Sequence, residues 1–124
     1  MNFKESKAIY LQIAERICDE ILQARYAEEA RIPSVREYAA LVEVNANTVM
    51  RSYEYLQSQE IIYNKRGIGY FVSPGACSQV LRLRRDAFFR EELPEFFRTL
   101  RMLDIPLAGL EEMYREFIES SKKE

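Results

Sequence analysis

Apolar residues recur at helical spacing near the start of the chain. Isoleucines stand four residues apart from Ile9 to Ile21. This period predicts one amphipathic helix that runs from a Ser6 N-cap to about Arg25. We expect its apolar stripe to lie in the core, behind the elements that follow.

The stretch from Ile32 to Val72 carries a denser series of short elements. Ser34 can accept a hydrogen bond from a first-turn N–H, and Glu37, three residues on, completes the form of a capping box. The apolar positions that follow predict a short helix up to Val42.

A second short helix is expected directly after a tight turn at Glu43-Val44. Asn45 is a suitable N-cap, and one face of this helix is apolar through Val49, Tyr53 and Leu56. The opposite face carries the side chains of Asn47, Met50, Arg51 and Glu54. This spacing is typical of a helix-turn-helix, whose second helix can lie in the major groove of DNA.

The pattern then changes to that of a β-hairpin. Ile61-Ile62-Tyr63 is an apolar run with β propensity, Asn64-Lys65-Arg66-Gly67 predicts a turn with a basic tip, and Gly69 to Val72 runs back. A further short strand is expected at Arg31-Ile32, after a charged connection. A basic hairpin after a helix-turn-helix can act as a wing that reaches phosphates or a minor groove.

Ser73-Pro74-Gly75 interrupts the pattern. We expect a boundary there between two domains, residues 1–74 and residues 75–124. The predicted fold class is mainly α with a small β-hairpin wing: a winged helix-turn-helix followed by a short all-helical dimerisation tail.

The tail is expected to be helical throughout. One helix runs from Ala76 to about Glu92, Pro94 begins or kinks the next, and a third follows the break at Asp104-Ile105-Pro106. Five of the seven phenylalanines lie in this tail, more large apolar groups than so short a segment buries alone. A second copy of the chain is the expected cover, and the candidate dimerisation residues are Leu83, Phe88, Phe96, Phe97, Leu100, Leu103, Leu110, Tyr114 and Phe117.

Composition removes most catalytic and metal-binding classes. The chain has 124 residues and no histidine, so the usual general base and commonest metal ligand is missing. Cys18 and Cys77 match no metal spacing, and Cys18 is expected to be a buried reduced thiol. The sequence holds no nucleophile-elbow, P-loop or dinucleotide-binding motif. We therefore expect no enzyme activity, no cofactor and no metal site.

Neither a membrane span nor a secretion signal is expected. The longest apolar runs are far shorter than the ~20 residues of a membrane-spanning helix. The N-terminal stretch MNFKESKAIY lacks the apolar centre of a signal peptide. The expected location is the cytoplasm, without contact with a membrane.

The charge balance limits how the protein can attract DNA. Lys and Arg number 18 and Asp and Glu number 20, a formal net charge of −2. A strongly basic balance is typical of DNA-binding domains. Any DNA surface must therefore be a local patch, and the expected patch comprises Arg36, Arg51, Lys65 and Arg66, helped by Lys4 or Lys7.

Four segments and two residues occur in an order and spacing that resembles a known family. They are AIYLQIAERI, IPSVREYA, NANTV and RGIGYFV, with Tyr53 and Leu56 between the last two segments. The resemblance is to the winged-helix domain of the GntR superfamily of bacterial transcription regulators, and the short tail resembles the YtrA-like subfamily. The resemblance implies a sequence-specific regulator, mostly a repressor in this subfamily, that binds a palindromic operator as a homodimer. The family usually has a glycine near position 29, where Glu29 stands, which leaves the shape of that turn open.

The candidate DNA-binding residues lie at the start of the first short helix, at the start of the second and at the hairpin tip. They are Arg36, Asn45, Ala46, Asn47, Thr48, Met50, Arg51, Lys65, Arg66 and Gly67. Ala46 and Met50 stand where some relatives carry polar base readers, so no relative's operator can be transferred to this chain.

Structural alternatives stay open for several of these side chains. Arg36 could be a solvated charge near Glu37, Asn47 and Thr48 could serve as capping residues, and Arg51 could pair with an acidic neighbour, Glu43 or Glu54. Arg82, Arg84 and Arg85 could assist DNA binding or form the solvated face of a helix.

Two questions of function also stay open at this point. The rival function is a winged-helix adaptor that binds proteins and not DNA, which the near-zero charge permits. A small-molecule effector of unknown identity, if there is one, would bind between the tail and the winged helix or between protomers.

Overall fold

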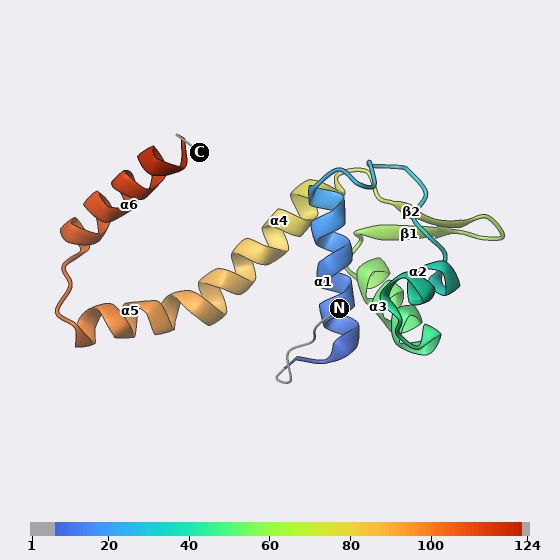
Figure 1. Cartoon of the computed structure of the whole chain (residues 1–124), viewed down its shortest axis with the longest axis horizontal. Coiled ribbons are helices and arrows are strands. Elements are labelled where there is room, and N and C mark those ends of the chain that lie inside the picture. The colour runs from blue at the N-terminus through green and yellow to red at the C-terminus, as the bar shows by residue number, and fades with distance from the viewer. Residues whose placement is uncertain (1–6, 123–124) are drawn as a thin grey trace. The chain divides into compact units, whose positions relative to one another are not determined.

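The computed structural model describes residues 7–122 and contains two compact units, the first ending at Leu83 and the second beginning at Arg84. The first unit holds the predicted helices and hairpin: α1 (Ile9–Leu22), α2 (Val35–Val42), α3 (Ala46–Ser58), β1 (Ile62–Lys65) and β2 (Gly69–Val72). Figure 1 shows the hairpin extending away from α3. The predicted winged helix-turn-helix fold, mainly α with a small hairpin, is confirmed. Within residues 7–122, no helix combines the length and apolar character that a bilayer crossing requires.

The core is built from the apolar stripes of α1 and α3. The isoleucine stripe of α1 is buried from Ile13 to Ile21. It belongs to the same cluster as Val49, Tyr53 and Leu56 of α3, which are 0% exposed. Burying each large side chain of this kind contributes about 1.5–3 kcal/mol. This packing fixes which face of α3 remains in solvent.

Helix α1 is shorter than the sequence predicted. It ends at Leu22 rather than near Arg25, because Ala24 has a left-handed backbone with φ 62° and donates its N–H to the Ile21 carbonyl over 3.0 Å. Its N-cap position is Ala8, which makes no side-chain capping bond. The predicted cap, Ser6, lies outside the described residues.

Side-chain caps set where α2 and α3 begin. The Ser34 N–H donates to the Glu37 carboxylate over 3.0 Å, and the Glu37 N–H donates to the Ser34 hydroxyl over 3.1 Å, so the predicted capping box is formed. Glu43 ends α2 with a left-handed φ of 56°. Asn45 then caps α3 by accepting the Asn47 N–H over 2.8 Å. Local chemistry thus sets the turn between the two helices.

The hairpin loop is shorter than predicted. β1 and β2 pair antiparallel in a register that ends with Lys65 opposite Gly69. Asn64 and Lys65, which the sequence assigned to the turn, belong to β1, and the loop is Arg66-Gly67-Ile68. Gly67 has a left-handed φ of 80°, and the Ile68 N–H donates to the Lys65 carbonyl over 2.9 Å. Three residues therefore suffice to reverse the chain.

The segment before α2 lies beside β2, as expected. An isolated bridge pairs Arg31 with Phe71, and the Val72 N–H donates to the Ala30 carbonyl over 2.9 Å. Glu29 has φ 67° and donates its N–H to the Val72 carbonyl over 2.7 Å. The turn therefore keeps a left-handed conformation at position 29 without glycine.

Helix α4 (Ala76–Ala87) begins inside the first unit. Ala76 is 0% exposed and Val80 is 1% exposed, and both belong to the winged-helix core. The compact unit therefore continues past Pro74, where the expected first domain ended. The Ser73-Pro74-Gly75 turn redirects the chain but does not end the packing.

The rest of the chain is helical. A π-helical turn, η1 (Phe88–Glu92), leads from α4 into α5 (Leu93–Met102), so Pro94 stands in the first turn of α5 and the helical backbone continues. α6 (Leu107–Ser121) follows the predicted break. Neither α5 nor α6 contains a buried residue. This lack of cover is the main property of the tail.

Candidate DNA interface

Helix α3 exposes the face opposite its buried stripe. Asn45, Ala46 and Asn47 are exposed at its start, Thr48 is half-buried, and Met50 is exposed one turn further on. First-turn N–H groups and short polar side chains at a helix start can bind phosphate oxygens. The predicted α3 residues thus share one accessible end of the helix.

Arg36 is an exposed side chain in the first turn of α2. Its neighbour Glu37 is already bonded to Ser34, whose N–H and hydroxyl hold the pKa of that carboxyl below its usual range. Glu37 is therefore engaged in capping α2. This geometry favours a role for Arg36 outside the protein's own ion pairs.

Arg51 forms no ion pair with either neighbouring glutamate. Among the described residues it pairs with neither Glu43 nor Glu54, and its guanidinium carbon lies 4.0 Å from the centroid of the Tyr10 ring. The side chain remains exposed. A cation stacked on an aromatic face keeps its charge available to a second partner.

The Lys65 ammonium group lies against a pair of stacked aromatic rings in the hairpin. Tyr63 and Phe71 stack across the two strands with centroids 5.7 Å apart, and the Lys65 ammonium lies 4.5 Å from the Phe71 centroid. Arg66 and Gly67 follow in the exposed loop. The three predicted wing residues therefore lie together at the far end of the hairpin.

A further cation beside the wing was missed in the sequence. Arg31 lies against Gly69, where a Cβ would stand 2.9 Å from the Arg31 Nε. Gly69 also has φ 145°. Two glycines in RGIGYFV signal a close approach of backbone, but nothing in the sequence shows that an arginine side chain occupies the space.

Tyrosines connect α3 to the segments on either side. Tyr53 donates its hydroxyl to the Pro33 carbonyl over 2.6 Å, and its ring meets the edge of Tyr70 with centroids 5.0 Å apart. Burial raises the pKa of Tyr53 well above its usual value, so the phenol stays a neutral donor. As predicted, Tyr53 fills the core. It holds α3 in position relative to α2 and the hairpin.

The candidate dimerisation residues fall into two groups. The exposed group, between 44% and 66% accessible, comprises Phe88, Phe96, Phe97, Leu103, Tyr114 and Phe117. The half-buried group comprises Leu83, Leu100 and Leu110, and Leu83 packs against the core of the first unit. Four further exposed apolar side chains lie in the second unit: Phe89, Met102, Leu107 and Met113.

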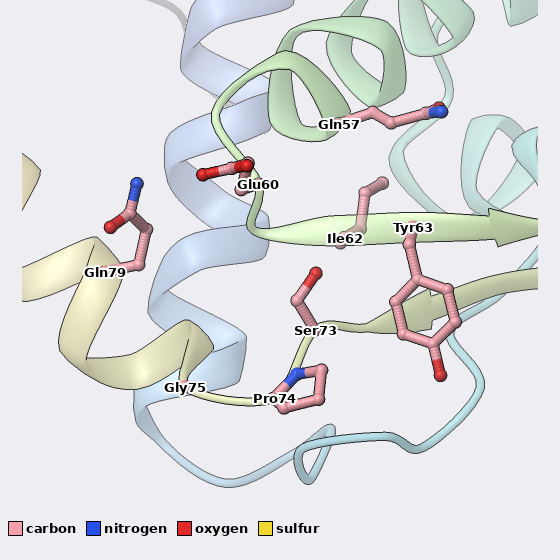
Figure 2. Close-up of a pocket in the computed structure, with 8 residues that line it drawn as sticks. All are labelled: Gln57, Glu60, Ile62, Tyr63, Ser73, Pro74, Gly75 and Gln79. Atoms are coloured by element: carbon pink, nitrogen blue, oxygen red, sulfur yellow. The ribbon is translucent and has the colours of Figure 1, made fainter.

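A shallow cavity of about 480 Å³ lies at the base of the hairpin, wholly within the first unit (Figure 2). Gln79 stands at one end, donating its amide to the Gln59 carbonyl over 2.9 Å and accepting from Arg82 over 2.7 Å. The lining residues come from α3, the turn that follows it, β1, the turn after β2 and α4: Gln57, Glu60, Ile62, Tyr63, Ser73, Pro74, Gly75 and Gln79. The cavity has space and hydrogen-bonding groups for a small polar molecule.

Residues 9–72 match the sequence profile described as bacterial regulatory proteins, gntR family. The match runs from the start of α1 to the end of β2 and covers more than half of the chain. The chain belongs to the GntR family. Resemblance to that family was the sequence-based prediction, and it is confirmed.

Two relatives from Bacillus subtilis (strain 168) match this GntR chain over most of its length. It is 32% identical over 118 residues to the uncharacterized HTH-type transcriptional regulator YhcF, covering 95% of this chain and 96% of YhcF. It is 27% identical over 113 residues to the HTH-type transcriptional repressor YtrA, covering 91% of this chain and 86% of YtrA.

Solved structures agree with the family and the fold. A crystal structure of a GntR-family protein from Bacteroides thetaiotaomicron shares 61% sequence identity and a TM-score of 0.84, covering 92% of this chain and 99% of that one. The DNA-binding domain of AraR in complex with operator ORR3 shares 26% identity and a TM-score of 0.50, covering 59% of this chain and 92% of that one.

These findings decide the class of function. The family and the relatives are transcription regulators and not enzymes, as the sequence predicted. The first unit is a DNA-binding helix-turn-helix, so the adaptor without DNA binding is not favoured. Residues 7–122 hold no group of three or more His, Cys, Asp or Glu side chains that could bind a metal ion.

Proposed function

We propose that this GntR regulator is a homodimeric repressor in the cytoplasm that binds a palindromic DNA operator. The observation that carries the proposal is the contrast between two exposed surfaces. α3 exposes polar groups over a fully buried apolar face, while α5 and α6 expose large apolar side chains and bury none. The first surface suits DNA and the second suits a protein.

Contacts with DNA would divide between register and sequence. Lys65 and Arg66 at the end of the hairpin would bind phosphates, which fix position without reading bases. Arg36 and the exposed side chains of α3 other than Arg51 would read base edges in the major groove. Ala46 could read only an apolar group such as a thymine methyl.

The apolar tail would pair two copies of the chain. Exposed aromatic side chains at this density mark an interaction surface, and most soluble oligomers are two-fold symmetric. A two-fold dimer places two recognition helices at mirrored half-sites, so the operator would be a palindrome. The relative YtrA is named a repressor, and we extend that mode of regulation to this chain.

Selection of binding sites from random double-stranded DNA tests the proposal for the operator. We expect a palindromic consensus sequence. Arg36→Ala should weaken binding to that consensus by about 1–3 kcal/mol if Arg36 reads a base. Lys65→Ala should weaken binding to all sequences and lower the slope of log affinity against log salt by about one.

Arg101→Ala, which removes an exposed arginine of α5, is the matched control for lost charge and should leave DNA affinity unchanged. All three variants should keep the wild-type melting temperature. A consensus without symmetry, or full affinity in both test variants, would contradict the proposed interface.

Sedimentation of the intact protein at micromolar concentration tests the proposal for the dimer. Phe97→Glu should convert a dimer to a monomer, because it places a charge in an apolar contact. Thr99→Glu adds the same charge at an exposed polar position of α5 and should remain dimeric. A wild-type monomer at this concentration would refute both the pairing role of the tail and the palindrome that depends on it.

We further propose that a small-molecule effector would bind in the cavity at the base of the hairpin. A ligand there would touch α3, β1 and α4 at once, so its binding could alter how α3 is held. Thermal-shift screening of small polar metabolites against wild type and Glu60→Gln tests the site. Shifts that are identical in both proteins would place the ligand elsewhere. A site between the tail and the winged helix, or between protomers, stays a prediction.

A further inference from the structure

The side chain of Arg51 in α3 lies against an aromatic ring from α1. Its guanidinium carbon lies 4.0 Å from the Tyr10 ring centroid, well within the range of a cation–π contact. Tyr10 is half-buried, while Arg51 is exposed on the same part of α3 as Asn47 and Met50. Helix α1 packs in the core, and through Tyr10 it also contacts a side chain on the accessible face of α3.

Two contacts keep Tyr10 in this place. The buried Ser52 hydroxyl lies 2.7 Å from the Tyr10 carbonyl and 3.2 Å from the Thr48 carbonyl, so it can donate to either. Tyr55, one turn further along α3, meets the Tyr10 ring edge-on with centroids 6.4 Å apart. Residues 51, 52 and 55 of α3 thus all contact Tyr10: the Ser52 hydroxyl fixes its backbone, and Tyr55 packs against its ring.

We propose that Tyr10 is a positioning residue for DNA binding, which holds the Arg51 guanidinium ready for a backbone phosphate. The inference rests on the proposed function and adds a residue of α1 to it. Stacking occupies the flat face of the guanidinium and leaves the N–H edge free, and that edge is the part that binds phosphate oxygens. A lysine ammonium has no flat face separate from its N–H donors, so lysine could not stack on the ring and bind phosphate in this way.

The expected benefit is entropic. A free arginine side chain samples many rotamers, and a phosphate contact must freeze them. An arginine already stacked on Tyr10 has lost most of that freedom before DNA arrives. A purely structural role for Tyr10 would instead act through the stability of the winged helix and would not depend on Arg51.

Binding of the full-length variants to the selected operator and to an unrelated duplex separates these roles. We expect Arg51→Ala to weaken binding to both duplexes about tenfold, as loss of a phosphate contact does. Tyr10→Leu should weaken both about three- to tenfold through lost preorganisation. Tyr10→Phe, which keeps the ring face, should bind as wild type. The double variant Tyr10→Leu/Arg51→Ala should bind no more weakly than Arg51→Ala alone.

Controls guard against a general loss of structure. Tyr26→Leu changes another half-buried tyrosine of the winged helix and should leave DNA affinity unchanged, and every variant should keep a cooperative melting transition. In the DNA-free protein, the Arg51 side-chain NMR resonance should be shifted by the ring current in wild type and Tyr10→Phe, and not in Tyr10→Leu.

The outcomes distinguish this inference from the function on which it rests. If the wild type binds no duplex DNA, the proposed function fails and the inference with it. If the wild type binds, but Tyr10→Leu binds equally well or its effect persists in full when Arg51 is absent, the positioning role alone is wrong.

Discussion

The helical turns after Pro74 should be part of the stable DNA-binding unit. The test compares the stability of a fragment that ends at Pro74 with that of a fragment that ends at Ala87. The shorter fragment loses Ala76 and Val80, which are 0% and 1% exposed in the winged-helix core. Their loss also opens the core to solvent where they packed.

The size of the effect follows from the buried groups. A fully buried valine side chain contributes about 1.5–3 kcal/mol, and the alanine methyl adds about 0.8 kcal/mol. The shorter fragment should therefore be less stable by about 2–4 kcal/mol. Small domains have a total stability of only about 5–15 kcal/mol, so this loss is a large share of the free energy of unfolding.

Urea unfolding of the two fragments, followed by circular dichroism, measures the difference directly. Within the longer fragment, Val80→Ala should lower the free energy of unfolding by about 1–3 kcal/mol. Leu81→Ala, at a 42% exposed neighbour on the same helix, should cost less than about 1 kcal/mol. The reasoning is refuted if the two fragments unfold at the same urea concentration and the two substitutions have equal effects.

Three further predictions concern stability. Gly69→Ala should lower the free energy of unfolding by about 1–3 kcal/mol, more than Gly67→Ala does. An added Cβ would stand 2.9 Å from the Arg31 Nε at position 69, and it would meet nothing within 4 Å at position 67. Equal urea midpoints for the two variants would contradict this. Tyr38→Phe should cost about 1–3 kcal/mol in the same assay, since it removes a 2.5 Å hydrogen bond to the buried Glu20 carboxylate, and an unchanged midpoint would count against that role. The pKa of Glu37 lies below its ordinary 4.5, so the ionised carboxylate stabilises the fold fully above pH 4.5, and this stabilisation is lost as the pH falls through the lower, folded-state pKa. Glu37→Gln should therefore make the free energy of unfolding fall less steeply at acid pH, and identical slopes for wild type and variant would exclude this.

The parts of the fold that were predictable depend on local chemistry. The capping box of Ser34 and Glu37 and the cap at Asn45 involve residues within three positions of each other, so the sequence shows both partners. The hairpin loop was assigned too long, because Asn64 and Lys65 suit a turn by type and only the strand register shows them paired. Pro74 marks a change of chain direction that the sequence shows, whereas the packing of Val80 beyond it against the winged-helix core depends on residues far away in the sequence.

The parts of the site that could not be predicted are contacts between distant segments. Helical periodicity, the basic hairpin turn and the family resemblance together supplied the candidate positions on α2, α3 and the hairpin. The pairing of Tyr10 with Arg51, and of Arg31 with Gly69, needs the path of the chain in three dimensions. No period or motif reports which of several arginines will meet a given ring.

Three glutamates occupy left-handed backbone: Glu29, Glu43 and Glu60, with φ of 67°, 56° and 62°. Glycine or asparagine is the usual residue there, and another L-residue holds strain of about 1–2 kcal/mol. Asparagine would relieve part of this strain without the added freedom that glycine gives the unfolded chain. All three positions lie outside the helices, and none is a candidate DNA contact. Asparagine at these positions should therefore give a more heat-resistant protein for co-crystallisation with DNA, because it relieves strain in the turns and leaves the candidate DNA-binding residues unchanged.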